Sequence, residues 1–201
     1  MSVLSNTTIR DYLYARYIKI TPPPDFEDSD DSPYDACSVK LHIGTKISEP
    51  DKLLKLAFDL SQKPKENLNK TIDKIWKEVE IPESGYVLEP EKFVLANTLE
   101  EIEFPPYVCN KDKRKRVLAG RIEGRSSFAR TGLLVHFTAP TIHAGFKGSI
   151  TLELLNHGPM PLILKPKLPI CQLIIETVRG LPSIPFDSQF QNQNSPSGKS
   201  D

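Results

Sequence analysis

Short alternating runs of apolar and polar residues dominate the hydrophobic pattern of the chain. Residues 37–43 alternate between apolar and polar side chains, which predicts a strand with one buried face that ends at Gly44. Further apolar runs, separated by Pro90 and by Asn97-Thr98, predict short strands at 86–88, 93–96 and 99–104. This spacing is typical of a β-sandwich or a small barrel.

The alternation becomes denser after Val117, where glycines and prolines divide it into further short runs. We expect this part of the chain to form the core of the sheet. The side chains predicted to be buried there are Val135, Phe137, Ile150, Leu152, Leu154, Leu162, Leu164, Ile170, Leu173 and Ile175.

Two segments have a helical period instead. Apolar residues between positions 9 and 17, preceded by candidate N-caps at 5–7, predict a short amphipathic helix that ends before Pro22. Residues 66–79 place five apolar side chains on one side of a helical wheel, and Pro82 prevents its continuation. We therefore expect a second helix, packed on the sheet, with Trp76 in the core.

The composition supports a mainly β chain. The 201 residues, 22.6 kDa in mass, suffice for one domain with one substantial core. Eighteen prolines against ten glycines favour short strands and fixed turns over a helix bundle. The apolar pattern is lost after Gly180, so we expect a single domain over residues 1–180 and a polar tail over residues 181–201.

The charge balance narrows the range of partners. The chain has 26 Lys+Arg and 26 Asp+Glu, a formal net charge of zero, which argues against nucleic acid and against an anionic membrane surface. The acidic cluster at 25–31 is typical of a solvated loop, with a divalent-cation site as the alternative. The basic run at 111–116 indicates a loop between strands, with a phosphate site as the alternative.

The cysteines and the apolar segments bear on the cellular compartment. Cys37, Cys109 and Cys171 are scattered and odd in number, which fits neither a disulfide framework nor a zinc site. The sequence has no N-terminal apolar region and no stretch approaching 18 apolar residues. We therefore expect a protein of the reducing cytoplasm that does not cross a membrane.

Two features of the second half could carry chemistry. Residues 124–130 (Gly-Arg-Ser-Ser-Phe-Ala-Arg) bring two guanidinium groups and two hydroxyls together, a set that can bind anionic oxygens. Glu153 stands between Leu152 and Leu154 in a predicted core strand, where a carboxylate is unusual. It faces either solvent or an enclosed site. In an enclosed site, with Arg130 beside it, Glu153 is suited to transfer protons.

These stretches resemble the dCTP deaminase family of the dUTPase-related superfamily. The resemblance rests on 124–130, on Val-His-Phe-Thr-Ala at 135–139 and on Ala-Gly-Phe-Lys-Gly-Ser-Ile-Thr-Leu-Glu at 144–153. It extends through Asn156 and through Ile-Cys-Gln-Leu at 170–173. Weaker similarity covers 38–44 and 188–193, so nearly the whole chain can be laid on the family.

The resemblance implies a distorted β-barrel of the dUTPase-like (β-clip) kind with a few short helices. It implies a homotrimer, or a higher assembly, with sites between subunits. It also implies deamination of the cytosine base of a deoxynucleoside triphosphate without a catalytic metal. The chain itself lacks the His-x-Glu and Pro-Cys-x-x-Cys spacing of zinc deaminases, so we expect no zinc. A Mg²⁺ ion would be bound through the substrate triphosphate.

The resemblance also assigns roles to residues. Glu153 would be the general base and acid that activates water, Ser126 and Arg130 would hold that water and stabilise charge, and the Ala139 carbonyl would orient it. The tail at 181–201 would close over the bound triphosphate. The substrate-binding set that the resemblance implies is Arg125, Ser126, Ser127, Arg130, His143, Thr151, Leu152, Phe186, Gln189 and Gln193.

The chain departs from the family at several of these positions. His143 stands where the family has an aspartate that meets the deoxyribose, and Phe186 and Gln189 replace a tyrosine and a lysine that touch phosphate. Lys40 and His42 replace an aspartate and an arginine in the early strand. Three functions therefore stay open: a dCTP deaminase, a bifunctional enzyme that also hydrolyses the triphosphate to dUMP, and a non-catalytic nucleotide-binding regulatory homologue.

Overall fold

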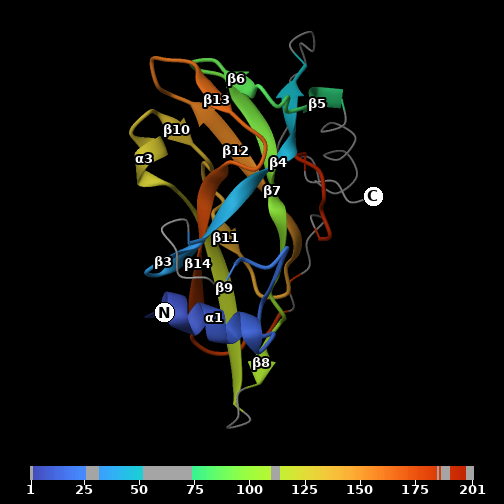
Figure 1. Ribbon diagram of the computed structural model, residues 1–201. Coiled ribbons are helices and arrows are strands. Elements are labelled where there is room, and N and C mark those ends of the chain that lie inside the picture. The colour runs from blue at the N-terminus through green and yellow to red at the C-terminus, as the bar shows by residue number, and fades with distance from the viewer. Residues whose placement is uncertain are drawn as a thin grey trace.

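The computed structural model describes residues 2–25, 32–51, 74–109, 114–184, 186 and 191–197. The described chain is mainly β, as the sequence predicts, and its elements follow one another as in Figure 1. They are β1 (Ser2–Val3), α1 (Asn6–Tyr14), β2 (Lys19–Thr21), β3 (Tyr34–Asp35), β4 (Ser38–Pro50), β5 (Trp76–Glu80), β6 (Tyr86–Leu88), β7 (Phe93–Glu103), β8 (Val108–Cys109), β9 (Lys115–Gly124), α3 (Ser126–Ala129), β10 (Leu133–Leu134), β11 (Thr141–Ile142), β12 (Lys147–Asn156), β13 (Leu162–Leu164) and β14 (Pro169–Val178).

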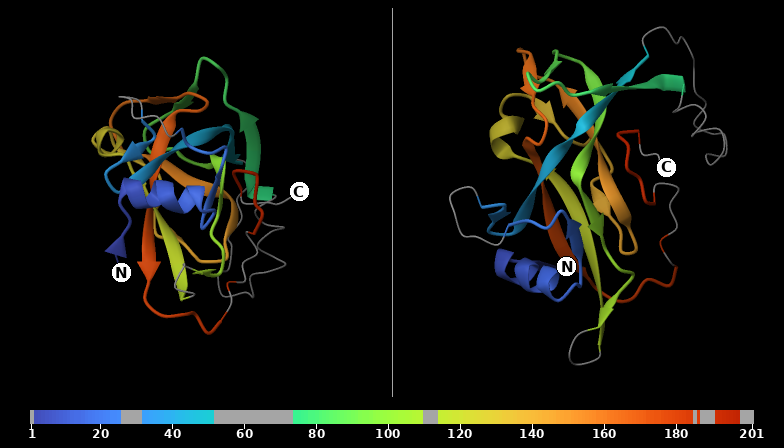
Figure 2. Two further views of the ribbon diagram at one scale, coloured as in Figure 1. Left: turned by 60° about the horizontal axis from the view of Figure 1, so that its bottom comes forward. Right: turned by 45° about the vertical axis from the view of Figure 1, so that its right-hand side comes forward.

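One antiparallel sheet organises the molecule. Its central path runs β10-β12-β7-β4-β14-β9-β11, the short strands β1, β2, β3, β5 and β8 pair with the long ones, and β6 and β13 form a separate pair. The sheet curls around its apolar face, with α1 lying across one end and α3 beside β10 (Figures 1 and 2). This curled sheet confirms the predicted barrel-like class.

Strand β4 does not end at Gly44, as the alternation predicted, but continues to Pro50. Its first half pairs with β14, and its second half pairs with β5 and β7. The pairing with β7 shifts register between Ile43 and Ile47, and a Cβ on Gly44 would lie only 3.1 Å from Asn97 Oδ1. Gly44 therefore allows β4 to cross close to β7 rather than terminating it.

Strand β7 is also longer than predicted. The sequence indicated a break at Asn97-Thr98, but Phe93–Glu103 is continuous. Thr98 is buried, and its hydroxyl donates to the Glu100 carbonyl at 2.7 Å and accepts from the Ile150 amide at 2.9 Å. These bonds satisfy backbone groups at the point where β12 shifts register between Ser149 and Thr151. Thr98, which the sequence placed at a turn, therefore stabilises a bulge.

The predicted helix at 66–79 is wrong from Trp76 onward, although residues 74–75 are helical. Residues 66–73 lie outside the described residues, and Trp76–Glu80 form β5, in which Trp76 is half-buried rather than a core residue. Cross-strand bonding to β4 outweighs the helical period here, and Lys46 Nζ lies 2.6 Å from Glu78 Oε1 across that pairing. The other predicted helix is confirmed as α1, whose N-cap Ser5 accepts from the Thr8 amide.

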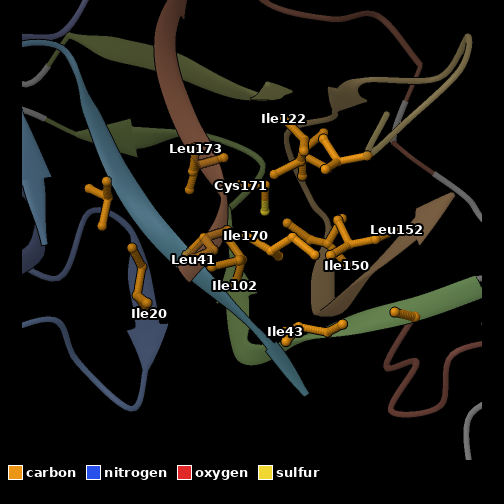
Figure 3. Close-up of a cluster of buried hydrophobic side chains, with 14 of the residues drawn as sticks. Ile20, Leu41, Ile43, Ile102, Ile122, Ile150, Leu152, Ile170, Cys171 and Leu173 are labelled. Atoms are coloured by element: carbon orange, nitrogen blue, oxygen red, sulfur yellow. The ribbon is translucent and has the colours of Figure 1, made fainter. Parts of the chain in front are cut away.

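The core lies inside the curl of the sheet. Figure 3 shows its apolar side chains converging from β2, β4, β7, β9, β12 and β14. Most of the predicted core is buried, but Leu162 is only half-buried and the Phe137 side chain is 45% exposed. Phe137 does not follow the predicted alternation of buried and exposed side chains, because regular pairing of β10 ends at Leu134. No helix within the described ranges is both long enough and apolar enough to span a membrane.

Of the acidic cluster at 25–31, residues 26–31 lie outside the described residues. Residues 111–113 of the basic run also lie outside them, whereas Lys115 and Arg116 begin β9 and pair with β8 instead of forming a loop.

Candidate active site

Strand β12 carries Glu153 on the face of the sheet opposite the core. Leu152 and Leu154 are fully buried, while Thr151 and Glu153 between them are only half-buried. The two-residue period of a strand thus turns the carboxylate outward. The bulge between Ser149 and Thr151 fixes the register at which this alternation starts.

The Glu153 carboxylate is held by the segment that follows β10. Its Oε2 accepts a hydrogen bond from the Phe137 amide at 2.9 Å, and the Glu153 amide donates to the Val135 carbonyl at 3.1 Å. Within the described part of the chain, Oε1 has no hydrogen-bond partner. One oxygen is therefore fixed and the other is available to a water molecule, the arrangement that general-base chemistry needs.

Thr151 and Leu152 stand directly before this carboxylate but differ in what they can offer. The Thr151 hydroxyl is buried and has no hydrogen-bond partner among the described residues. A buried orphan hydroxyl costs free energy unless a ligand or water completes it. The Leu152 side chain is 0% exposed and points into the core (Figure 3), so it cannot itself line a substrate pocket.

Ala139 lies in the same segment, two residues beyond Phe137. The segment is tied to the sheet at both ends, because the Val135 and Pro140 carbonyls accept from the amides of Glu153 and Ile122. Ala139 itself is exposed. The structure therefore brings Glu153 and the 135–139 segment together, as the motif spacing suggested.

The cluster at 124–130 is not part of this arrangement within one chain. Ser126, Ser127 and Arg130 are exposed on or just after α3. The neighbouring Gly132 carbonyl accepts from the His157 amide at 2.8 Å, just beyond the end of β12 and four residues from Glu153, or about 13 Å at the rise of a strand. Among the described residues, none of these three side chains makes a hydrogen bond or ion pair with Glu153. A single copy keeps the two halves of the predicted site apart.

Arg125 lies on a different wall. Its Nη1 donates to the Pro169 carbonyl at 2.8 Å, and its guanidinium lies 5.0 Å from the Phe128 ring centroid. With Lys40 and Lys167 it lines a hollow of about 500 Å³. The carboxylates of Asp25 and Glu100 line the same hollow, so its three cations outnumber its acidic groups by one. Lys40 and Lys167 were not part of the predicted site.

His143 and Phe186 are brought together as predicted site neighbours. Their ring centroids lie 5.2 Å apart with an interplanar angle of 33°. Both line a hollow of about 640 Å³, together with Tyr107 and Lys115. Phe186 thus gives the imidazole an aromatic neighbour without the hydroxyl of the tyrosine that the family motif implies at this position.

The C-terminal segment lies against β12 (Figure 2), while Gln189 lies outside the described residues. Gln193 is buried, its Nε2 donates to the Ser149 carbonyl at 2.6 Å, and its own carbonyl accepts from the Ser149 amide at 2.9 Å. Gly148 makes this approach possible, because its φ is +138° and a Cβ would lie 2.9 Å from the Gln193 amide.

Sequence reasoning missed two contributors to this region. Phe137 supplies the amide that holds Glu153, and Gln191 bridges the tail to the sheet by accepting from the Lys147 amide at 2.9 Å and donating to the Gly145 carbonyl at 2.7 Å. Phe137 occupies the variable position of the Val-His-x-Thr-Ala motif, the only available hint of its role. No group of three or more His, Cys, Asp or Glu in the described ranges gathers to hold a metal ion.

Comparisons with known proteins place these features in context. Residues 3–178 match a family model described as dCTP deaminase-like. The dCTP deaminase of Pseudoalteromonas translucida is 33% identical over 198 residues, covering 96% of this chain and 94% of the relative. A relative from Methanobrevibacter smithii named "dCTP deaminase, dUMP-forming" is 32% identical over 193 residues, covering 96% and 89%.

A solved structure shares the fold. The 2′-deoxycytidine 5′-triphosphate deaminase from Agrobacterium tumefaciens superimposes with a TM-score of 0.59 at 18% sequence identity, over 86% of this chain. The chain covers 46% of that protein, less than half of its length. At this identity the likeness supports the fold alone.

Proposed function

The chain belongs to the dCTP deaminase family, and we propose that it converts dCTP to dUTP and ammonia with Glu153 as both general base and general acid. It is an enzyme of the hydrolytic deaminase class that serves nucleotide metabolism. The observation that supports the assignment of Glu153 is its geometry. The Phe137 amide fixes one carboxylate oxygen, and the other oxygen is open beside the orphan hydroxyl of Thr151.

The reaction uses the free oxygen of that carboxylate. Glu153 takes a proton from a water molecule as the water oxygen bonds to C4 of the cytosine ring. The glutamic acid then delivers this proton to the 4-amino nitrogen, the C4–N bond breaks and ammonia leaves. That delivery restores the Glu153 carboxylate, and the second water proton moves from the new C4 hydroxyl to N3, which gives the uracil ring. The orphan Thr151 hydroxyl is available to bind the base edge.

Ser126 and Arg130 complete the site from another copy of the chain. Both side chains are exposed, and neither bonds to Glu153 within the described part of one chain, which supports this, since side chains that act on the same water must lie within hydrogen-bond reach of it. Closed cyclic assembly is the usual way in which identical chains share such sites. We infer a homotrimer in which Arg130 stabilises the developing charge and the Ala139 carbonyl orients the water.

The triphosphate is held by positive charge and by the tail. Arg125 and Ser127 would contact phosphate oxygens, and the tail at 181–201, including Phe186, Gln189 and Gln193, would close over them. Mg²⁺ enters as part of the substrate, bound mainly by phosphate and water oxygens. The reaction at C4 needs no catalytic metal, and the sequence lacks the ligand spacing of the zinc deaminases.

His143 would face the sugar. Its ring can donate to the 3′-hydroxyl but supplies no fixed anion to position a water for triphosphate hydrolysis. We therefore favour dUTP over dUMP as the product. The relative named as dUMP-forming is no more similar to this chain than the plain dCTP deaminase is, at 32% against 33% identity.

The three free cysteines support work in the reducing cytoplasm, because Cys37 and Cys109 are exposed and unpaired.

The test is a product assay with a matched variant. The purified chain is incubated with magnesium and dCTP, CTP, dUTP or UTP, and the products are separated by ion-exchange chromatography. We expect conversion of dCTP to dUTP, with no conversion by Glu153→Gln, which keeps the shape of the side chain but not the carboxylate. Turnover by Glu153→Gln at the wild-type rate would refute the assigned mechanism. Appearance of dUMP would show a bifunctional enzyme, and nucleotide binding without turnover a regulatory homologue.

A further inference from the structure

Three aromatic rings form a continuous ladder on the outer face of the sheet. The ring centroids of Trp76 and Phe93 lie 5.6 Å apart at an interplanar angle of 70°, and those of Phe93 and Phe137 lie 5.4 Å apart at 84°. Both contacts are edge-to-face, the arrangement that aromatic pairs prefer. The ladder therefore links β5, through β7, to the segment that holds Glu153.

The ladder lies beside the carboxylate. Phe93 pairs with Leu155 across β7 and β12, and Leu95 pairs with Glu153. Paired residues of an antiparallel sheet point to the same face, so Phe93 and Glu153 are diagonal neighbours, about 7–8 Å apart. The ring of Phe93 can thus support Phe137, whose amide reaches Glu153.

The segment around Phe137 has little other support. Regular pairing ends at Leu134, and the next ties to the sheet are the Val135 and Pro140 carbonyls and the His136 ring, whose Nε2 lies 3.8 Å from Glu123 Oε2. Between them, the described contacts of Phe137 are its amide bond to Glu153 and its ring contact with Phe93. Phe137 is 45% exposed as a residue, so burial alone does not fix its ring.

We propose that the Trp76–Phe93–Phe137 ladder is a positioning device for the deaminase reaction, which holds the Phe137 amide against Glu153 Oε2 and so aims Oε1 at the water. Phe93 and Trp76 touch neither the substrate nor the reacting atoms, and they act through Phe137. The inference rests on the proposed role of Glu153. Its structural part, the order of the Phe137 amide, can be measured without any turnover.

The experiment compares Phe93→Leu with Phe93→Tyr, which keeps the ring. In the free protein, hydrogen exchange at the Phe137 amide should accelerate about threefold to tenfold in Phe93→Leu, the range expected from loss of an aromatic pair, and stay near wild type in Phe93→Tyr. The kcat for dCTP should fall by a similar factor in Phe93→Leu while KM stays within about twofold, because the device acts on the chemical step and not on substrate binding.

Trp76 gives a second route, should Phe93→Leu fold poorly. It is the only tryptophan of the chain, so its emission reports on the ladder directly. Nucleotide binding should shift that emission in the wild type and in Phe93→Tyr. Trp76→Leu should repeat the kcat loss in milder form. The matched control is Tyr17→Leu, which breaks a similar edge-to-face pair with Tyr12, centroids 5.3 Å apart, away from the site.

The outcomes separate the two claims. Unchanged amide exchange and unchanged kcat in Phe93→Leu would overturn the ladder, as would an equal kcat loss in Tyr17→Leu. If the wild type does not deaminate dCTP at all, the proposed function fails, while faster exchange at the Phe137 amide in Phe93→Leu would still uphold the positioning of that amide.

Discussion

The docking of the C-terminal segment on β12 gives a prediction whose magnitude follows from the structure. Gln193 is only 6% exposed, and its side-chain Nε2 donates to the Ser149 carbonyl at 2.6 Å. Gln193→Ala removes that donor and leaves the carbonyl buried and unsatisfied. The cost is about 1–3 kcal/mol, so the equilibrium between docked and undocked tail should shift by about 5- to 150-fold.

Amide hydrogen exchange reads this equilibrium directly. The Ser149 amide donates to the Gln193 carbonyl at 2.9 Å, and the Asn192 amide donates to the Lys147 carbonyl at 2.7 Å. Both amides should exchange faster in Gln193→Ala by the factor above. The melting temperature should hardly change, because the segment opens locally without unfolding the sheet.

The matched control is Asn192→Gly. Asn192 is exposed and has φ 56°, a left-handed conformation that glycine adopts freely, so the control changes the neighbouring residue without loss of the buried bond. Equal exchange of the Ser149 amide in Gln193→Ala, the control and the wild type would refute the reasoning.

Two further predictions concern the core. The Asn156 side-chain amide donates to the carbonyls of Leu88 and Met160 at 2.9 and 2.8 Å and accepts from the Gly158 amide. Asn156→Leu removes these bonds, so the free energy of unfolding measured in urea should fall by about 3 kcal/mol or more. A fall below about 1 kcal/mol would contradict the account. Burial, aided by the nearby Glu100 carboxylate, raises the pKa of the Cys171 thiol. A thiol reagent at pH 8 should therefore label the exposed Cys37 and Cys109 quickly in the native protein and Cys171 only in urea. Because only the unfolded state then releases the thiol proton, stability should fall as the pH rises above the ordinary cysteine pKa. Rapid labelling of all three thiols in the native protein would exclude a buried neutral Cys171.

The sequence predicted those parts of the fold in which the local alternation of apolar residues matches the burial that tertiary packing requires. Strict alternation around Leu152 and Leu154 meets a core that needs those side chains, and it also turns Glu153 outward. Alternation failed at Phe137, because the chain leaves regular pairing after Leu134. No local signal distinguishes the end of a pairing from its continuation.

Long-range pairing accounts for the larger errors. The helical period around Trp76 was overruled by pairing of β5 with β4, and the apparent turn at Asn97-Thr98 is a continuous strand stabilised by a bond to Ile150. Partners some 30 to 50 residues away decide both cases.

Only the part of the site that lies on neighbouring segments of the chain could be predicted from the sequence. The motif at 135–139 and Glu153 meet because β10 and β12 pair, a contact between neighbouring segments. The register of that same pairing sets Leu133 opposite Asn156, three residues beyond Glu153, and motif spacing does not reveal this offset. A site shared between copies cannot be deduced from the order of residues in one chain.

The central claim is that Glu153 of one copy works with Arg130 of another, and mixing two inactive variants tests it most directly. Glu153→Gln and Arg130→Ala are each assayed alone with dCTP, then unfolded together, refolded as an equal mixture and assayed again. The account predicts that each variant alone is inactive and that the mixture regains about a quarter of the wild-type activity, since one in four shared sites then combines two intact halves. A mixture as inactive as its parents, or a fully active Arg130→Ala, would contradict the claim.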